Sequence, residues 1–268
     1  MSPLLARALA GAALGLGVTI IARRSHALSR SGAAAALVVA VICTAAGWSW
    51  ALILMAFFVT ANLVSRYRTQ TRDARVGDMT EKGEERDAWQ VVANGGVFAA
   101  AAIAYLFHPS ELWLPVAAGA IAAATADTWA TEIGTVGARL PRLITTGRPV
   151  TAGTSGGVSW LGSLAGLAGA TFIGIGALIV GWSVQAAGAA VAGGVAGMLA
   201  DSLAGASIQR RGWCPTCSKP TERLVHSCGS NTEARGGIHW VNNDAVNAIG
   251  SIAGAAIGSI FWYWPPSL

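Results

Sequence analysis

Charged residues are scarce in this chain of 268 residues: they make up 12% of it, against roughly 25% in an average soluble domain. Lysine is nearly absent, and there are only four cysteines. These shortages exclude an ordinary soluble globule, a disordered chain and a secreted disulfide framework. Hydrophobic residues are abundant, at 53%, and so are glycines, at 34. The composition predicts an integral membrane protein, in which a net charge of +5 does not indicate nucleic acid as a partner.

Mostly apolar runs, long enough for the roughly 20 residues that cross a bilayer, occur eight times. We therefore expect an all-α fold: a polytopic integral membrane protein with about eight transmembrane helices in a single transmembrane domain, residues 1–268. Arg23 and Arg24 follow the first run, whereas a secretory signal carries its positive charge first, so we expect this run to be retained as a helix. The predicted spans are 4–22, 31–47, 49–65, 91–107, 112–133, 158–181, 184–208 and 243–264.

The basic residues predict the topology of these spans. The links after the first, third, fifth and seventh spans hold 3, 6, 3 and 5 of them, which is 17 of the 18 in the chain. Because positive charge is retained on the cytoplasmic side, these links are predicted to be cytoplasmic and both termini to lie on the opposite side. Six tryptophans at the predicted outer ends are typical of an interfacial belt: Trp48, Trp50, Trp113, Trp182, Trp262 and Trp264.

Small residues recur every fourth position in two spans, at Gly250, Gly254 and Gly258, and at Gly162, Gly166, Ala170 and Gly174. In lipid this spacing lets helices approach closely. The pattern predicts tight packing and leaves open whether the stripes pack within one chain or between two.

Acids and amides of four spans are predicted to gather at the cytoplasmic face. Ionisable residues inside a membrane are costly and by default indicate function. The fifth and seventh spans end there and the fourth and eighth begin there. The acids are Asp127, Glu132, Asp201 and Asp244, and the amides are Asn94, Asn243 and Asn247.

Carboxylates with amide and hydroxyl oxygens suit Mg²⁺, which is held by a few carboxylates and completed by substrate phosphates. On a regular helix Asp127 and Glu132 lie about 140° apart. We therefore expect Glu132 to pair with an arginine or orient a ligand, while Asp127, Asp201 and Asp244 hold Mg²⁺. The alternative is that these acids only neutralise one another or cap helix ends.

The link from Gly134 to Gly157 combines glycines, hydroxyls and an arginine before a predicted helix. Backbone N–H groups and a helix N-terminus favour anions, and an arginine can clamp a phosphate. It is not a Walker A loop, because Gly-Lys-Ser/Thr is absent. A flexible linker is the alternative. The predicted phosphate-binding residues are Thr145, Thr146, Arg148, Thr154, Ser155, Gly156 and Gly157.

The third link, residues 66–90, carries six basic and six acidic residues. A solvated helical arm is one interpretation. The other is that Arg86 or Gln90 grips a nucleotide.

Cysteines cluster in the fourth cytoplasmic link, residues 209–241. Cys214 and Cys217 form a C-x-x-C pair, and His226 and Cys228 follow. This set predicts a possible structural zinc knuckle. His239 is a rival fourth ligand, and reduced thiols without metal are the alternative.

Two motifs resemble a known integral membrane family long labelled as a domain of unknown function. They are Asp127-Thr128-x-x-Thr131-Glu132-Ile133-Gly134 and Asn242-Asn243-Asp244-x-x-Asn247. The similarity runs from about residue 60 to the end, through segments 81–96, 124–134, 145–159, 200–205, 214–228 and 240–251. The family includes plant plastid phytyl-phosphate kinases and the animal transmembrane protein nineteen. At Thr131 it often has Ser, which keeps the hydroxyl.

The resemblance implies a CTP-dependent kinase that converts an isoprenyl monophosphate, such as phytyl phosphate, to the diphosphate with Mg²⁺. It also implies distant kinship with membrane cytidylyltransferases. Two alternatives remain: a CTP-dependent lipid cytidylyltransferase, and a transporter of an anionic substrate. A transporter would place charges near the bilayer midplane and break paired helices.

Overall fold

Eight helices form most of the structure, a computed structural model that describes residues 2–76, 85–137 and 139–263, apart from the side chains of 67–76. The prediction of a helical membrane fold is confirmed. The helices are α1 (Pro3–Arg24), α2 (Arg30–Ala46), α3 (Trp48–Val76), α4 (Ala88–Phe107), α5 (Trp113–Gly134), α6 (Trp160–Ile179), α7 (Val184–Ser207) and α8 (Asn243–Tyr263).

Six of these helices are long and apolar enough to cross a membrane: α1, residues 48–66 of α3, α4, α6, α7 and α8. The apolar helix α2 is shorter, with 17 residues. Helix α5 is not among the six. Its 22 residues still give a length of about 33 Å, and it contacts α3, α4, α6, α7 and α8. The helix that carries Asp127 and Glu132 is therefore enclosed by other helices.

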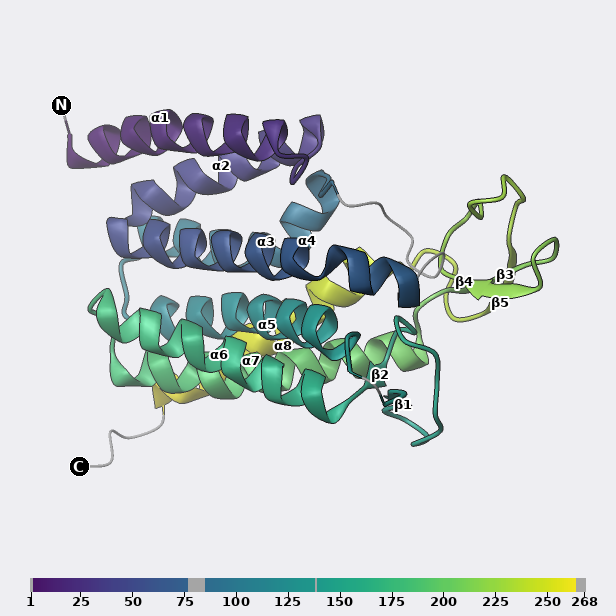
Figure 1. Cartoon of the computed structure of the whole chain (residues 1–268). Coiled ribbons are helices and arrows are strands. Elements are labelled where there is room, and N and C mark those ends of the chain that lie inside the picture. Colours follow the sequence, from purple (N-terminus) through teal and green to yellow (C-terminus); the bar gives the residue numbers. More distant parts are fainter. Residues whose placement is uncertain (1, 77–84, 138, 264–268) are drawn as a thin grey trace.

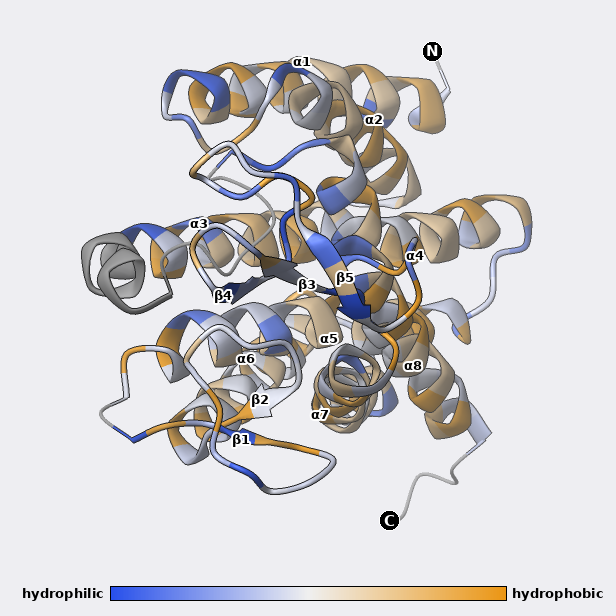
Figure 2. Cartoon of the chain, turned by 90° about the vertical axis from the view of Figure 1, so that its right-hand side faces the viewer, coloured by the Kyte–Doolittle hydropathy of each residue, from blue (hydrophilic) through white to orange (hydrophobic). Residues whose placement is uncertain are grey.

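Successive helices run back and forth, so the links after α1, α5 and α7 meet at one end of the bundle (Figure 1). Short strands in these links were not predicted: β1 (Arg142–Leu143) pairs antiparallel with β2 (Gly157–Val158), and β3 (Arg211–Cys214) lies between β4 (Lys219–Thr221) and β5 (Glu233–Gly236). Seen from this end, hydrophilic residues gather on the links and helix ends that face the viewer (Figure 2).

Side-chain caps fix where several helices begin at this end. Asp87 and Gln90 form a reciprocal capping box at α4, which satisfies two backbone donors that a helix N-terminus leaves open. Ser159 caps α6 through the backbone N–H of Gly162. Asn242 accepts from the N–H of Ala245 in the first turn of α8. These caps hold the first turns of three helices beside the polar links.

Glycines bring α5, α7 and α8 into backbone contact, which answers the question left open by their spacing. A Cβ at Gly193 of α7 would lie 2.6 Å from the carbonyl oxygen of Gly254 on α8 and 2.9 Å from Cα of Gly119 on α5. A Cβ at Gly197 would lie 2.6 Å from the carbonyl oxygen of Gly250. Real Cβ atoms do not come this close, so the stripe on α8 packs within the chain.

The predicted tryptophan belt is wrong at two positions. Trp50 and Trp182 are buried, and their rings lie 5.2 Å apart, next to Phe98. They stabilise the core where α3, α4 and the α6–α7 link meet, because aromatic pairs gain from offset and edge contacts. Trp48 and Trp262 are exposed, as a belt requires. Trp264 and part of the predicted helical arm, residues 77–84, lie outside the described residues.

Candidate functional site

A polar cavity of about 320 Å³ lies at the end of the bundle where the links gather. Its walls come from α3, α5 and α7, from the first residues of α4 and α8, from the loop before α6 and from the loop after β4. Seven elements and loops, many of them distant in sequence, thus contribute residues to one space. The polar residues that line it include Asn62, Ser65, Arg66, Arg86, Gln90, Asp127, Thr131, Glu132, Thr154, Ser155, Asp201, Ser202, Glu222 and Asn243.

Two acids face each other inside this cavity. The carboxyl groups of Asp127 on α5 and Asp201 on α7 both line the cavity and interact with one another. The Oδ2 atom of Asp201 is buried, and no residue that the structure describes donates a hydrogen bond to it. Two adjacent carboxylates in a desolvated place repel each other unless a proton or a cation lies between them. The pair therefore fits a divalent cation held by hard oxygen ligands.

Glu132 lies apart from this pair on the face of α5 toward α3. It is buried, and the Ser65 hydroxyl donates to its Oε1 atom at 3.1 Å. The different side of the helix agrees with the expected angular separation from Asp127, while its predicted role stays a prediction.

Arg86 enters the cavity because the segment before α4 is pinned to the α1–α2 turn. The N–H of Arg86 donates to the carbonyl of Ala27 at 3.1 Å, and the N–H of Ser29 donates to the carbonyl of Arg86 at 3.0 Å. The guanidinium then donates to the Ser65 hydroxyl at 3.4 Å. Backbone bonds on both sides hold this cation at the cavity wall, and the nucleotide-gripping role of Arg86 stays a prediction.

The loop before α6 reaches the cavity through Thr154, Ser155, Gly156 and Gly157. Gly156 has φ +77°, and a Cβ there would lie 2.6 Å from the backbone nitrogen of Ala206. Only glycine combines this left-handed backbone with such a close approach. The loop is consequently pressed onto the last turns of α7, next to Asp201.

Other predicted site residues lie elsewhere. Thr145, Thr146 and Arg148 are exposed and do not line the cavity, because the loop turns outward at β1. Asp244 is buried and is not among the lining residues. Asn94 and Asn247 line a neighbouring apolar groove, and Asn243 lines both spaces. The predicted roles of these residues stay predictions.

Sequence reasoning missed Glu222, which follows β4 and extends into the cavity. The Ser155 hydroxyl donates to its Oε1 atom. Arg210 fixes this turn, because its guanidinium donates to the carbonyl of Glu222 at 3.4 Å and to the Thr232 hydroxyl at 3.1 Å. In the sequence Glu222 is one of several charged residues of a polar link, so only its position after the C-x-x-C pair could have singled it out.

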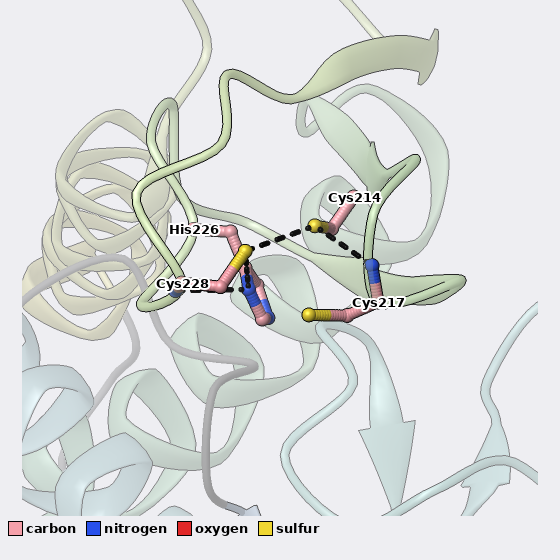
Figure 3. A group of neighbouring side chains, drawn as sticks. All are labelled: Cys214, Cys217, His226 and Cys228. Carbon is pink, nitrogen blue, oxygen red and sulfur yellow. Dashed lines mark hydrogen bonds between the residues drawn. The ribbon is translucent and has the colours of Figure 1, made fainter.

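The cysteine link brings four metal-ligand side chains together, as Figure 3 shows. Cys214, Cys217, His226 and Cys228 each offer a donor atom, and all four atoms lie within 4.8 Å of one another. The Sγ atoms of Cys214 and Cys228 are 3.7 Å apart, while two thiolates on a tetrahedral zinc are separated by roughly 3.8 Å for Zn–S bonds of about 2.3 Å. The cluster could therefore bind a metal such as zinc, with His226 rather than His239.

The thiols of this cluster differ in acidity. Burial raises the pKa of the Cys214 thiol, but hydrogen bonds from the Cys217 N–H and from the Cys228 and Cys217 side chains outweigh it, so the pKa is lowered. The hydrogen bond with Cys228, followed by desolvation, raises the pKa of Cys217 to about 11. Cys214 thus ionises before Cys217.

Comparison with known proteins places the chain in a family. The sequence profile described as "Integral membrane protein DUF92" matches residues 13–255. The chain belongs to this family. An uncharacterized membrane protein of Methanocaldococcus jannaschii is 32% identical to it over 217 residues, which are 81% of this chain and 77% of the relative.

Two further family relatives come from phototrophs. Protein PGR of Arabidopsis thaliana is 29% identical over 90% of this chain and 92% of its own length. An uncharacterized membrane protein of Synechocystis is 29% identical over 81% of this chain and 75% of its own. No solved structure matches. The chain is therefore a multi-pass integral membrane protein of the DUF92 family.

Proposed function

We propose that this protein is a CTP-dependent kinase that phosphorylates an isoprenyl monophosphate to the diphosphate at the cytoplasmic end of the bundle. The observation that carries the proposal is the pair of Asp127 and Asp201. They share a cavity with Arg86, and none of the described residues donates to Oδ2 of Asp201. Acids for a cation beside an arginine for a phosphate are the parts that phosphoryl transfer needs.

The transfer needs no strong base. An ionised oxygen of the lipid monophosphate attacks the γ-phosphorus of CTP, and the bond from that phosphorus to the β–γ bridging oxygen breaks. CDP leaves with the electron pair, and the lipid gains a phosphoanhydride bond. Because the acceptor is already ionised, catalysis consists of positioning the two phosphates in line and stabilising charge.

Several cavity residues have a role in this scheme. Asp127 and Asp201 would hold Mg²⁺, which when bound neutralises triphosphate charge. Arg86 stabilises charge on the transferred group, and the hydroxyls of Thr154 and Ser155 with the backbone N–H groups of Ser155 and Gly156 bind phosphate oxygens. Asn243 orients them from the start of α8. Asp244, which does not line the cavity, is the least supported of the predicted Mg²⁺ ligands.

CTP as the donor and an isoprenyl chain on the acceptor come from the family resemblance. The lack of lysine supports the use of arginine for the phosphates. Cytidylyl transfer is the competing reaction, since it would use the same cavity but break the bond between the α- and β-phosphates.

The test is product analysis with purified protein in detergent, Mg²⁺, CTP and a panel of isoprenyl monophosphates. The proposal expects equal amounts of CDP and lipid diphosphate. Pyrophosphate with a CMP-lipid would establish the cytidylyltransferase instead. A lack of turnover with every acceptor and every nucleoside triphosphate, from protein that is folded, would contradict the kinase.

A further inference from the structure

An apolar groove of about 360 Å³ lies along α1, α2, α3 and the start of α4. It is lined by residues between 11 and 19 of α1, between 36 and 44 of α2, between 48 and 58 of α3 and between 90 and 95 of α4. Its walls are mostly aliphatic and aromatic, including Val39, Phe57 and Phe58. Such a surface suits a hydrocarbon chain, whose contacts are apolar.

The groove and the polar cavity meet. Six residues line both, namely Arg86, Gln90, Asp127, Thr131, Glu132 and Asn243. Of the charged residues that the structure describes in the groove wall, Arg86, Asp127 and Glu132 all lie at this junction. The two spaces together are polar at one end and apolar along the rest, which is the pattern of a lipid with one charged headgroup.

The groove opens toward the bilayer. Leu14 of α1 is 58% exposed, and Leu52 and Met55 of α3 are 56% and 38% exposed. These three side chains line the groove, and α1 and α3 both pack against α2. In a membrane their exposed surface faces lipid tails, so a hydrocarbon chain reaches the groove without passing through water.

We propose that this groove holds the hydrocarbon chain of a single-chain lipid phosphate, which enters sideways from the bilayer between α1 and α3 and places its phosphate beside Arg86. The proposal rests on the proposed function and adds the acceptor's binding site. The volume lies near the lower end of the roughly 300 to 1,000 Å³ of ligand pockets, which suits one chain rather than the two of a diacyl lipid.

The far end of the groove sets how much chain it accepts. Along α3 it extends from Phe58 to Trp48, about 15 Å at 1.5 Å per residue. At that end α1 and α2 approach so closely that a Cβ at Gly11 would lie 2.7 Å from Cβ of Thr44. Ala51 lines the groove one helical turn from Trp48, on the side of the polar cavity. A larger side chain at position 51 therefore shortens the part of the groove that can hold the hydrocarbon chain.

Photolabelling tests the groove without requiring turnover. The full-length protein in detergent is irradiated with an isoprenyl monophosphate that carries a photoreactive group at the end of its chain, and labelled peptides are mapped by mass spectrometry. We expect label in residues 11–19, 36–44 and 48–58, displaced by unlabelled isoprenyl monophosphate and not by phosphatidic acid. Label mainly on α6, or label that excess isoprenyl monophosphate does not displace, would contradict the groove as the binding site of the hydrocarbon chain. Equal displacement of the label by phosphatidic acid would contradict the proposal that the groove prefers a lipid with a single chain.

A chain-length series provides the second measurement. Ala51→Phe should lower kcat/KM for geranylgeranyl and phytyl phosphate by about 10-fold or more while sparing geranyl phosphate. Ala51→Leu, a smaller change, should act in the same direction. Ala56→Phe is the matched control, because Ala56 lies on the same helix, is half-buried and lines neither space. A parallel loss for all chain lengths in Ala51→Phe would contradict the proposal.

The two measurements separate this inference from the proposed function. Displaceable label in the groove without phosphoryl transfer would support the groove as the lipid-binding site and contradict the proposed kinase activity. Phosphoryl transfer with label outside the groove would support the kinase activity and contradict the groove as the lipid-binding site.

Discussion

Glycine has one further consequence in only one of the two halves of the bundle, where it lines an open groove. In the half made by α5, α6, α7 and α8, glycines bring backbones together: a Cβ at Gly193 or Gly197 would lie 2.6 Å from a carbonyl oxygen of α8. In the half made by α1 to α4, Gly11 and Gly32 also make close approaches, but Gly95 meets only Val39, at 3.8 Å, and lines the groove. The first half is a dense scaffold that fixes Asp127 against Asp201, and the second leaves room for a ligand.

The largest expected effect is on folding of the dense half. Gly254→Val should destabilise the protein by about 3 kcal/mol or more, because the new side chain meets the backbone of Gly119, which cannot move aside. Fluorescence-detected gel filtration and the Tm in detergent measure it. Gly95→Ala is the control and should leave Tm unchanged or slightly raised, since Ala favours helices by about 0.5 to 1 kcal/mol. Equal losses in both variants would contradict the difference between the halves.

The next effect is on chemistry. Asp127→Asn should lower kcat by about 10²-fold or more, the cost typical of removing one element of electrostatic stabilisation, and should also weaken Mg²⁺ dependence. The variant should fold, because its side chain has nearly the same volume. Glu111→Gln is the matched control, since Glu111 is exposed in the α4–α5 link and does not line the cavity. Full turnover in Asp127→Asn would remove Asp127 from the cation site.

A smaller effect distinguishes two arginines. Arg86→Gln should lower kcat/KM by about 10- to 100-fold, the worth of a charge-assisted hydrogen bond of about 1.5 to 3 kcal/mol. Arg148→Gln should change it little, because Arg148 is exposed and does not line the cavity. Steady-state kinetics with CTP and lipid varied separately measure both. The reverse order would favour the phosphate clamp that the sequence predicted.

The smallest expected effect comes from the cysteine link. Cys214→Ser should abolish binding of one zinc per chain and lower turnover severalfold, because the link positions Glu222 against Ser155. Since the ligands must be deprotonated, metal affinity should fall as pH is lowered. Cys43→Ala is the control, as Cys43 lies in the core. Elemental analysis showing the same zinc content in Cys214→Ser and wild type would contradict the metal cluster.

The fold was largely predictable because its signals are local. Apolar length predicts the helices, and the one-sided arginines predict which links share a face, without knowledge of packing. Trp50 and Trp182 show the limit: their position at span ends was visible, but burial against Phe98 depends on how α3 and α4 meet. The enclosure of α5 by five helices is likewise a property of the assembled bundle.

The candidate site was partly predictable for the same reason. Asp127 and Asp201 are acidic residues within apolar runs, so the sequence alone indicates each of them as a candidate site residue. Arg86 could not be preferred over Arg148, because its position depends on backbone bonds to the distant turn at Ala27 and Ser29. Glu222 could not be recognised, because its contact with Ser155 joins two links 67 residues apart.

The central claim is that Asp127 and Asp201 of the dense half serve phosphoryl transfer to a lipid phosphate. The most direct measurement uses purified protein with Mg²⁺, an isoprenyl monophosphate and CTP labelled separately in its γ-phosphate and in its cytosine, with Asp127→Asn beside the wild type. The account predicts that γ-label enters the lipid, that cytosine label stays in CDP and that Asp127→Asn transfers neither. Cytosine label in the lipid, or γ-label transfer at the wild-type rate by Asp127→Asn, would contradict it.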